Sequence, residues 1–220
     1  MKVDALLFDF DGVLIESEYA GNRQIAEWLS GAGYPTTAAQ SMEHFMGLAG
    51  PEFVTAIEGW IGGLIPDSFH AARRAEDERA MAEGIDPVAG AIAFVRSLPA
   101  DLPKAVVSSS PTRWIRRHLA HIGLTDVFGD HVYSGREHVT RGKPAPDLYL
   151  YGAAQLGVAI ERCAILEDSP VGATGAVASG GYVIGLCAGT HCAIGHDQRL
   201  LAIGVDAVAH DFAEVARLLA

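Results

Sequence analysis

Short apolar runs alternate with segments of helical periodicity along most of this chain. The apolar runs predict buried strands at 3–8, 105–107, 132–133, 163–166 and 182–186, with a weaker strand at 205–208. Apolar residues spaced three or four apart predict helices at 17–32, 88–98, 112–122, 147–156, 170–179, 196–203 and 212–219. This alternation predicts an α/β fold with a parallel sheet and helices on both of its faces.

A long helical block interrupts the alternation. Residues 38–85 show helical spacing throughout, with one break at Gly47–Pro51. We therefore expect a small all-helical domain at 16–86, inserted after the first strand. The core domain would then consist of 1–15 and 87–220.

Composition narrows the class of protein. Half of the 220 residues are hydrophobic, but no stretch approaches the ~20 apolar residues that span a bilayer, so no membrane partner is expected. Asp4, close to the start of the sequence, does not fit a signal peptide, which favours a cytoplasmic protein. The net charge of −11 repels a phosphate backbone and argues against nucleic acid as a partner.

The same charge would repel an anionic substrate unless cations offset it locally. Lysines are scarce, so the position of each is informative: they are Lys2, Lys104 and Lys143. The three cysteines form no CxxC pair and show no metal-binding spacing, so we interpret them as reduced, structural thiols. They are Cys163, Cys187 and Cys192.

Two pairs of acidic residues each follow a predicted strand. Asp9 and Asp11 stand in the run Asp-Phe-Asp-Gly, in which Gly12 permits a sharp turn, and Glu167 and Asp168 follow the strand at 163–166. Paired carboxylates repel each other unless a cation lies between them, and they are good ligands for a hard cation. Asp9 could act as a nucleophile and Asp11 as a general acid and base. Taken singly, the first pair also fits a surface turn and the second a helix cap.

Two further runs offer groups that bind phosphate. Ser108 and Ser109 follow the strand at 105–107, where hydroxyls and free backbone amides suit a phosphoryl oxygen, although serines before Pro111 also fit a helix N-cap. Lys143 lies in the stiff loop Gly-Lys-Pro-Ala-Pro-Asp, which would hold its charge beside carboxylates or phosphate. Taken alone, it also fits a solvated lysine in a turn. All four clusters fall at predicted carboxyl ends of strands, where open α/β sheets bind their ligands.

In this order, the four clusters resemble the signature motifs of the haloacid dehalogenase-like hydrolase superfamily. The resemblance covers essentially the whole chain and lies in DFDGVL at 9–14, the serine run at 108, GKPAPD at 142–147 and EDSPVG at 167–172. It implies a Rossmann-like core with an inserted helical cap. The subgroup it resembles contains beta-phosphoglucomutase and many sugar-phosphate phosphatases.

The resemblance implies a mechanism as well. Asp9 would be the nucleophile that forms a phosphoaspartate, and Asp11 the general acid and base. Mg²⁺ would be held by Asp9, the backbone carbonyl of Asp11 and Asp168, with assistance from Glu167. The residues implied or considered for phosphate and substrate binding are Gly12, Ser108, Ser109, Lys143 and Arg23. The leading hypothesis is thus a Mg²⁺-dependent phosphatase for a small sugar, polyol or sugar-acid phosphate, acting as a monomer or homodimer.

Departures from the family pattern separate the possible activities. The mutase carries a histidine and an arginine in its cap, and the matching positions here are Gly21 and Gly50, which argues against a mutase. No lysine lies in the inserted block, which argues against phosphonatase chemistry. The dehalogenases lack the second aspartate, so Asp11 favours phosphate esters. The family usually has an aspartate at the position of Glu16, and we expect glutamate to be tolerated there.

Two alternatives remain beside the phosphatase. One is a phosphosugar mutase on the same scaffold, and the other is a non-catalytic phosphate-binding module. A dead enzyme should have lost at least one of four residues, and the presence of all four argues against the second alternative. They are Asp9, Asp11, Lys143 and Asp168.

Other side chains permit weaker hypotheses. Arg23 could reach a substrate, but it also fits a solvated helix face. His191 and His196 could line the site or be structural. The run that contains Arg73 is expected on an exposed helix with ion pairs along it. Trp114, like the other two tryptophans, is expected to serve packing.

Overall fold

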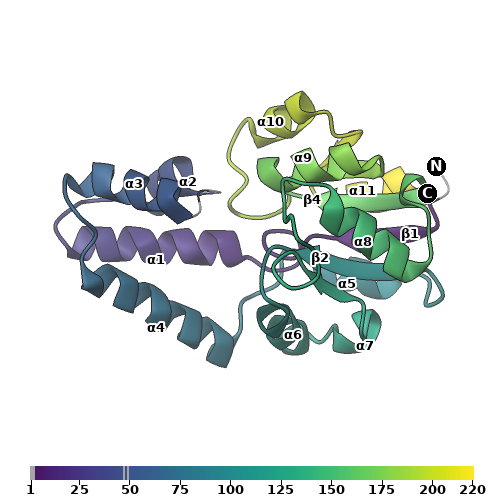
Figure 1. Cartoon of the computed structure of the whole chain (residues 1–220), viewed down its shortest axis with the longest axis horizontal. Coiled ribbons are helices and arrows are strands. Elements are labelled where there is room, and N and C mark those ends of the chain that lie inside the picture. The colour runs from purple at the N-terminus through teal and green to yellow at the C-terminus, as the bar shows by residue number, and fades with distance from the viewer. Residues whose placement is uncertain (1–2, 47, 49) are drawn as a thin grey trace. The chain divides into compact units, whose positions relative to one another are not determined.

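Six parallel strands form one sheet, in the order β3-β2-β1-β4-β5-β6 (Figure 1). The strands are β1 (Ala5–Phe8), β2 (Lys104–Ser108), β3 (Val132–Ser134), β4 (Cys163–Glu167), β5 (Tyr182–Leu186) and β6 (Ala207–Ala209). The expected α/β class with a parallel sheet is confirmed, and each strand lies within a few residues of its predicted position.

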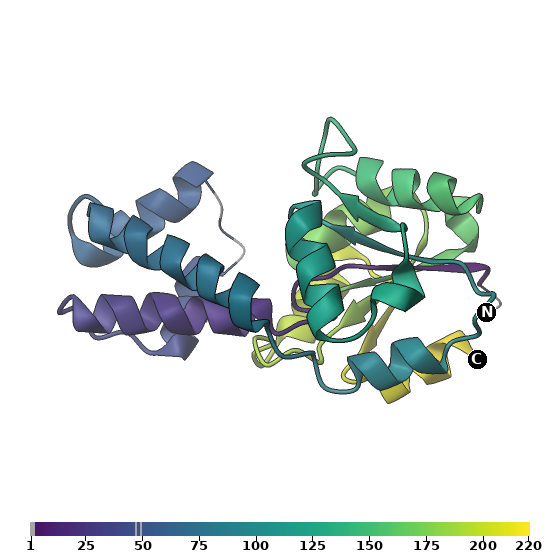
Figure 2. The same cartoon turned by 90° about the horizontal axis from the view of Figure 1, so that it is seen from below.

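Helices cover both faces of this sheet. They are α5 (Ala91–Ser97), α6 (Thr112–His121), α7 (Thr125–Phe128), α8 (Asp147–Leu156), α9 (Pro170–Ser179), α10 (His196–Ile203) and α11 (Phe212–Leu219), with a short 3-10 helix, η1 (Ile160–Arg162). Helix α8 packs against α9, while α5 packs against α11 on the other side of the sheet (Figure 2). The short elements α7 and η1 had no counterpart among the predicted elements.

The central strand β1 buries side chains on both faces. Leu7 packs with Val107 and Tyr149 in the apolar cluster beneath α8. Phe8 points to the opposite face, where its ring lies edge-on to Phe94 and Phe128 at 6.3 Å and 5.6 Å between centroids. Because both faces are covered, the strand is apolar along its whole length and becomes polar only where it ends.

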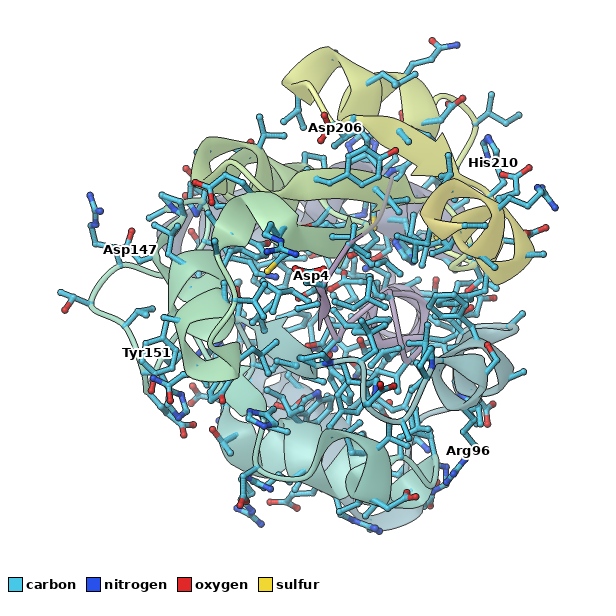
Figure 3. The ribbon with its side chains drawn as sticks, turned by 90° about the vertical axis from the view of Figure 1, so that its right-hand side faces the viewer. Asp4, Arg96, Asp147, Tyr151, Asp206 and His210 are labelled. Carbon is cyan, nitrogen blue, oxygen red and sulfur yellow. The ribbon has the colours of Figure 1, made fainter. Side chains whose placement is uncertain are left out.

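The structure describes residues 3–46, 48 and 50–220, and the chain divides into two units. The core unit comprises Met1–Glu16 and Asp86–Ala220, and the helical unit comprises Ser17–Ile85. At their junction, the backbone nitrogen of Glu16 donates to the carbonyl oxygen of Asp86 at 2.9 Å, and Ile15 pairs with Pro87 in an antiparallel bridge. The two segments of the core unit therefore lie side by side where the insertion begins and ends. Figure 3 shows charged side chains such as Arg96 and Asp147 at the periphery of the core unit.

The helical unit consists of four helices: α1 (Ser17–Gly31), α2 (Ala38–Phe45), α3 (Gly50–Ile61) and α4 (Asp67–Glu83). Its apolar core includes Leu29, Phe45, Ile57 and Phe69. Of the expected break at Gly47–Pro51, residues 47 and 49 lie outside the described residues. No helix in the described part of the chain is both long and apolar enough to cross a membrane.

The charge run on α4 matches its expectation at Arg79 and departs from it at Arg73. Arg73 does not only take part in a solvated charge run along α4, because its Nη1 donates to the backbone oxygen of Gly21 at 3.2 Å and to Gln24 at 3.0 Å. It therefore links α4 to α1. Pairs along the helix do form at Arg79, which bonds Glu76 and Glu83.

Candidate active site

The sheet topology gathers the predicted clusters at one edge. Strand β1 lies between β2 and β4, and Phe8 pairs with Val106 on one side and Leu166 on the other. The residues that follow these strands therefore emerge together at the carboxyl edge. They include Asp9, Asp11, Ser108, Glu167 and Asp168.

Lys143 is buried between two of these carboxylates. Its Nζ lies 2.5 Å from Asp9 Oδ1 and 2.5 Å from Glu167 Oε1, and its side chain is 4% exposed. Burial disfavours the charge of Lys143, but Asp9 and Glu167 outweigh that effect, so the pKa of Lys143 is raised and the ammonium stays charged. The structure therefore does not support the solvated-lysine alternative.

Glu167 is fully buried and accepts four hydrogen bonds. Oε1 accepts from Lys143 and, at 2.7 Å, from the hydroxyl of Tyr149. Oε2 accepts from both the backbone nitrogen and the hydroxyl of Ser169, each at 3.1 Å. A carboxylate offers about four acceptor positions, so these donors fill the side chain. Glu167 is thus placed to hold Lys143 against Asp9 rather than to give an oxygen directly to a cation.

Asp168 is held by two histidines from the segment after β5. His191 Nε2 lies 2.8 Å from Asp168 Oδ2, and His196 Nε2 donates to the backbone oxygen of Asp168 at 2.5 Å. All three residues are buried. The loop is tied down once more by Thr190, whose hydroxyl donates to Glu16 at 2.6 Å. These contacts fix both the backbone and the side chain of Asp168.

Asp11 accepts hydrogen bonds on both of its oxygens. Ser110 Oγ donates to Oδ2 at 2.6 Å, Ser108 Oγ donates to the same atom at 3.2 Å, and Trp114 Nε1 donates to Oδ1 at 3.1 Å. The expectation that Trp114 serves packing alone was therefore wrong. The serines do not cap α6 through their side chains, since its N-cap is Pro111 without a side-chain bond.

Two glycines allow these side chains to approach the backbone. Gly12 has a φ of +82°, and a Cβ built there would lie 2.1 Å from Asp168 Oδ2. A Cβ at Gly172 would lie 1.8 Å from Glu167 Oε1. Any larger residue would displace a carboxylate, so glycine is required at both positions. The helix-cap interpretation of the Glu167–Pro170 segment also holds, because Ser169 caps α9 with Pro170 at its first position.

The charge balance of the site favours a cation. Burial raises the pKa of Asp9 well above its ordinary value, Lys143 opposes this, and Glu167, Asp168 and Asp11 add to it. Asp9, Glu167 and Asp168 offer carboxylate oxygens that lie within 4.8 Å of one another. An all-oxygen, carboxylate-rich donor set fits a hard divalent cation, whose charge would also favour ionised Asp9.

The structure brings most of the predicted site residues together, but not all. Asp9, Asp11, Ser108, Lys143, Glu167 and Asp168, with Gly12 beside them, lie at the same sheet edge. Ser109 is exposed at the end of β2. Arg23 belongs to the helical unit, where it is exposed and lies 3.6 Å from Glu27.

Several residues at the site were not singled out from the sequence. They are Tyr149, Trp114, which was expected to serve packing, and Ser110, which lies in the serine run but was given no role. His191 and His196 were named as side chains that could line the site, and both contact Asp168. Ser110 carried a signal, because it belongs to the same run of hydroxyl residues that follows the strand at 105–107. The others come from helices and a loop whose placement no local pattern indicates.

A family model described as haloacid dehalogenase-like hydrolase matches residues 3–180. The chain therefore belongs to this family of hydrolases. It is 32% identical to hexitol phosphatase A of Escherichia coli K12, over 84% of this chain and 83% of that protein. It is 26% identical to 6-phosphogluconate phosphatase of the same organism, over 86% and 85% of the two chains.

The fold likeness extends over the whole chain. A family hydrolase from Deinococcus radiodurans R1, solved with bound phosphate and sodium, superposes with a TM-score of 0.86 at 31% identity. That match covers 99% of this chain and 95% of the other. Both of the relatives from Escherichia coli are named as phosphatases.

Proposed function

We propose that this chain is a Mg²⁺-dependent phosphatase that hydrolyses a small phosphorylated sugar, polyol or sugar acid through a phosphoaspartate on Asp9. The observation that carries the proposal is the buried contact of Lys143 with Asp9 at 2.5 Å, beside Asp168 and Glu167. A carboxylate fixed by a lysine and surrounded by further carboxylates suits a nucleophile that works with a bound cation. The relatives named as phosphatases of a hexitol and of 6-phosphogluconate support the substrate class.

The reaction would proceed in two displacements. A carboxylate oxygen of Asp9 forms a bond to phosphorus while the phosphorus–oxygen ester bond breaks, and Asp11 gives its proton to the departing alkoxide. Water then attacks phosphorus, the bond to Asp9 breaks, and Asp11 takes the proton of the water. Inorganic phosphate leaves, and both aspartates return to their starting forms.

Fixed groups of the chain would stabilise this transfer. Lys143 keeps its charge and can neutralise the equatorial oxygens, while Glu167 holds the ammonium in place. Ser108, whose hydroxyl now bonds Asp11, could turn to a phosphoryl oxygen. Ser110 and Trp114 would keep the carboxyl group of Asp11 oriented between its two proton transfers.

Asp9, Asp168 and the backbone oxygen of Asp11 would hold Mg²⁺, with Glu167 acting through water because its oxygens already accept four hydrogen bonds. When bound, the cation supplies charge neutralisation to the phosphoryl oxygens. The helical unit Ser17–Ile85 would serve as the cap that selects the organic part of the substrate.

The test is phosphate release from a panel of hexitol phosphates, sugar phosphates and sugar-acid phosphates, with and without Mg²⁺. Wild type should release phosphate only with Mg²⁺, while Asp9→Asn and Asp11→Asn should each lose nearly all activity. Asp126→Asn, which changes an exposed aspartate paired with Arg96, is the matched control and should match the wild type. Near-normal turnover by Asp9→Asn would refute the assignment of the nucleophile.

A further inference from the structure

A second group of side chains that could hold a metal ion contacts Asp168 and lies in the segment after β5. Ligand atoms of His191, Cys192 and His196 all lie within 4.8 Å of one another. Cys187 is not one of these three residues, but its thiol adjoins that of Cys192. One sulfur and two imidazoles therefore meet at one place, with a second sulfur beside them, and this donor set is quite unlike the carboxylates of the candidate active site.

The spacing of these atoms suits a soft cation. Cys192 Sγ lies 3.4 Å from His191 Nε2. In a tetrahedral zinc site, bonds of about 2.3 Å to sulfur and 2.0 Å to nitrogen place those two ligand atoms roughly 3.5 Å apart. A set of two sulfurs and two nitrogens is also the donor combination that favours zinc over magnesium.

Ions could reach these side chains through a cavity of about 370 Å³. Cys187, Cys192 and His196 belong to its lining, together with Asp197 and His210. His210 lies at the periphery of the core unit in Figure 3. The loop itself is ordered by Thr190, which bonds Glu16, and by the backbone bond from Cys192 to Gly189 at 3.0 Å. The donors are thus held in place beside an open space.

We propose that Cys187, His191, Cys192 and His196 form a regulatory site for a soft divalent cation such as Zn²⁺. Binding releases the protons of the two thiols, and the Nε2 proton of His191 moves to Nδ1 so that Nε2 can bind the ion. His191 Nε2 now lies 2.8 Å from Asp168 Oδ2. One ring nitrogen cannot bond Asp168 and a cation at once. A cation bound at this site therefore removes the contact between His191 and Asp168, and activity falls.

The site itself is tested without any enzyme assay. Co²⁺ is added to the full-length, metal-free chain in the presence of excess Mg²⁺, which keeps the carboxylate cluster filled. We expect one Co²⁺ per chain with the intense near-ultraviolet band of cobalt–thiolate bonds. Cys192→Ala should lose the band, and Cys187→Ala should retain about half of its intensity.

Cys163→Ala is the matched control, since Cys163 lies in β4 and should leave the band unchanged. Circular dichroism of each variant shows whether it is folded. Absence of the band in wild type, or its survival in folded Cys192→Ala, would overturn the site.

The effect on activity rests on the proposed function and is measured separately. Zn²⁺ should inhibit phosphate release by wild type even at saturating Mg²⁺, and Cys192→Ala should need at least ten times more Zn²⁺ for the same inhibition. Inhibition that excess Mg²⁺ relieves equally in both proteins would show that Zn²⁺ only replaces Mg²⁺, and would overturn the regulatory role. If no ester is hydrolysed, the proposed function fails while the cobalt spectrum still decides the site.

Discussion

The indole nitrogen of Trp114 donates a hydrogen bond to Asp11 Oδ1 at 3.1 Å, although the two residues lie 103 positions apart in the sequence. The bond joins the first turn of α6 to the loop after β1. On the other oxygen of Asp11, Ser110 and Ser108 are the donors. The acid and base of the proposed reaction is therefore oriented from both sides.

Replacement of Trp114 by phenylalanine should slow turnover. Trp114→Phe keeps an aromatic ring beside His118 but removes the donor to Oδ1. A hydrogen bond to a charged group contributes about 1.5–3 kcal/mol, so we expect kcat to fall roughly tenfold or more with little change in KM. Trp60→Phe, which removes an indole bond to Thr36 inside the helical unit, is the control. Equal kcat for the two variants would contradict the role of Trp114.

Tyr149→Phe should destabilise the core unit. The hydroxyl of Tyr149 is buried and donates to Glu167 Oε1 at 2.7 Å, so its removal leaves a buried charge with one donor fewer. We expect the free energy of unfolding in urea to fall by about 2 kcal/mol. Tyr34→Phe, at a tyrosine that is 38% exposed, should leave it unchanged. If the two variants unfold alike, the bond to Glu167 contributes nothing to stability.

Mg²⁺ should stabilise the protein near neutral pH. Burial raises the pKa of Asp9 above its ordinary value of 3.8, so this carboxyl stabilises the fold below that pH and loses its contribution as the pH rises through the folded value. A cation beside Asp9 favours the ionised form of this carboxyl and so offsets the stability that is lost as the pH rises. We expect saturating Mg²⁺ to raise the unfolding midpoint at pH 7 by roughly 5 °C, and by less at pH 4.

Scanning calorimetry with and without MgCl₂ measures this effect. Asp168→Asn should abolish the increase because it removes a proposed ligand, whereas Asp126→Asn should keep it. An undiminished increase in Asp168→Asn would place the ion elsewhere.

His118 should make the fold sensitive to acid. Burial lowers the pKa of His118 from 6.5 to about 4, and neither ring nitrogen has a hydrogen-bond partner among the described residues. Because the pKa of His118 is lowered in the folded state, this residue contributes stability above pH 6.5. That contribution is lost as the pH falls toward 4. Between pH 7 and pH 5 this loss amounts to about 2 kcal/mol.

Urea unfolding at both pH values isolates the contribution of this histidine. His118→Phe should lose about 2 kcal/mol less than wild type between pH 7 and pH 5. His121→Phe, at an exposed position of the same helix, should follow the wild type. If His118→Phe shows the full wild-type loss, another group is responsible.

The sequence-based predictions were strongest where one physical constraint dominates. A strand covered on both faces must be apolar, so the run ending at Phe8 and the run ending at Leu166 both predicted strands with acidic residues at their carboxyl ends. Parallel strands in one sheet then bring those ends together. The position of Asp9 near Asp168 follows from these two facts, before any contact is known.

Contacts that depend on how a helix is placed could not be predicted. Trp114 and Tyr149 lie in α6 and α8, and their distances to Asp11 and Glu167 depend on how those helices pack. An apolar pattern identifies the buried face of a helix but not which buried group it will meet. Tyr149 therefore looked like any other core residue, although its hydroxyl bonds a buried carboxylate.

The bond between Glu16 and Asp86 has a consequence for how this architecture can change. The chain leaves the sheet and returns to it at adjacent backbone positions, so the 69 residues between them, Ser17–Ile85, occupy what is geometrically a single hairpin loop. A loop whose two ends are already paired can be lengthened, shortened or exchanged without altering the register of any strand. Recombination at these two positions could therefore transplant a different helical unit onto an intact sheet.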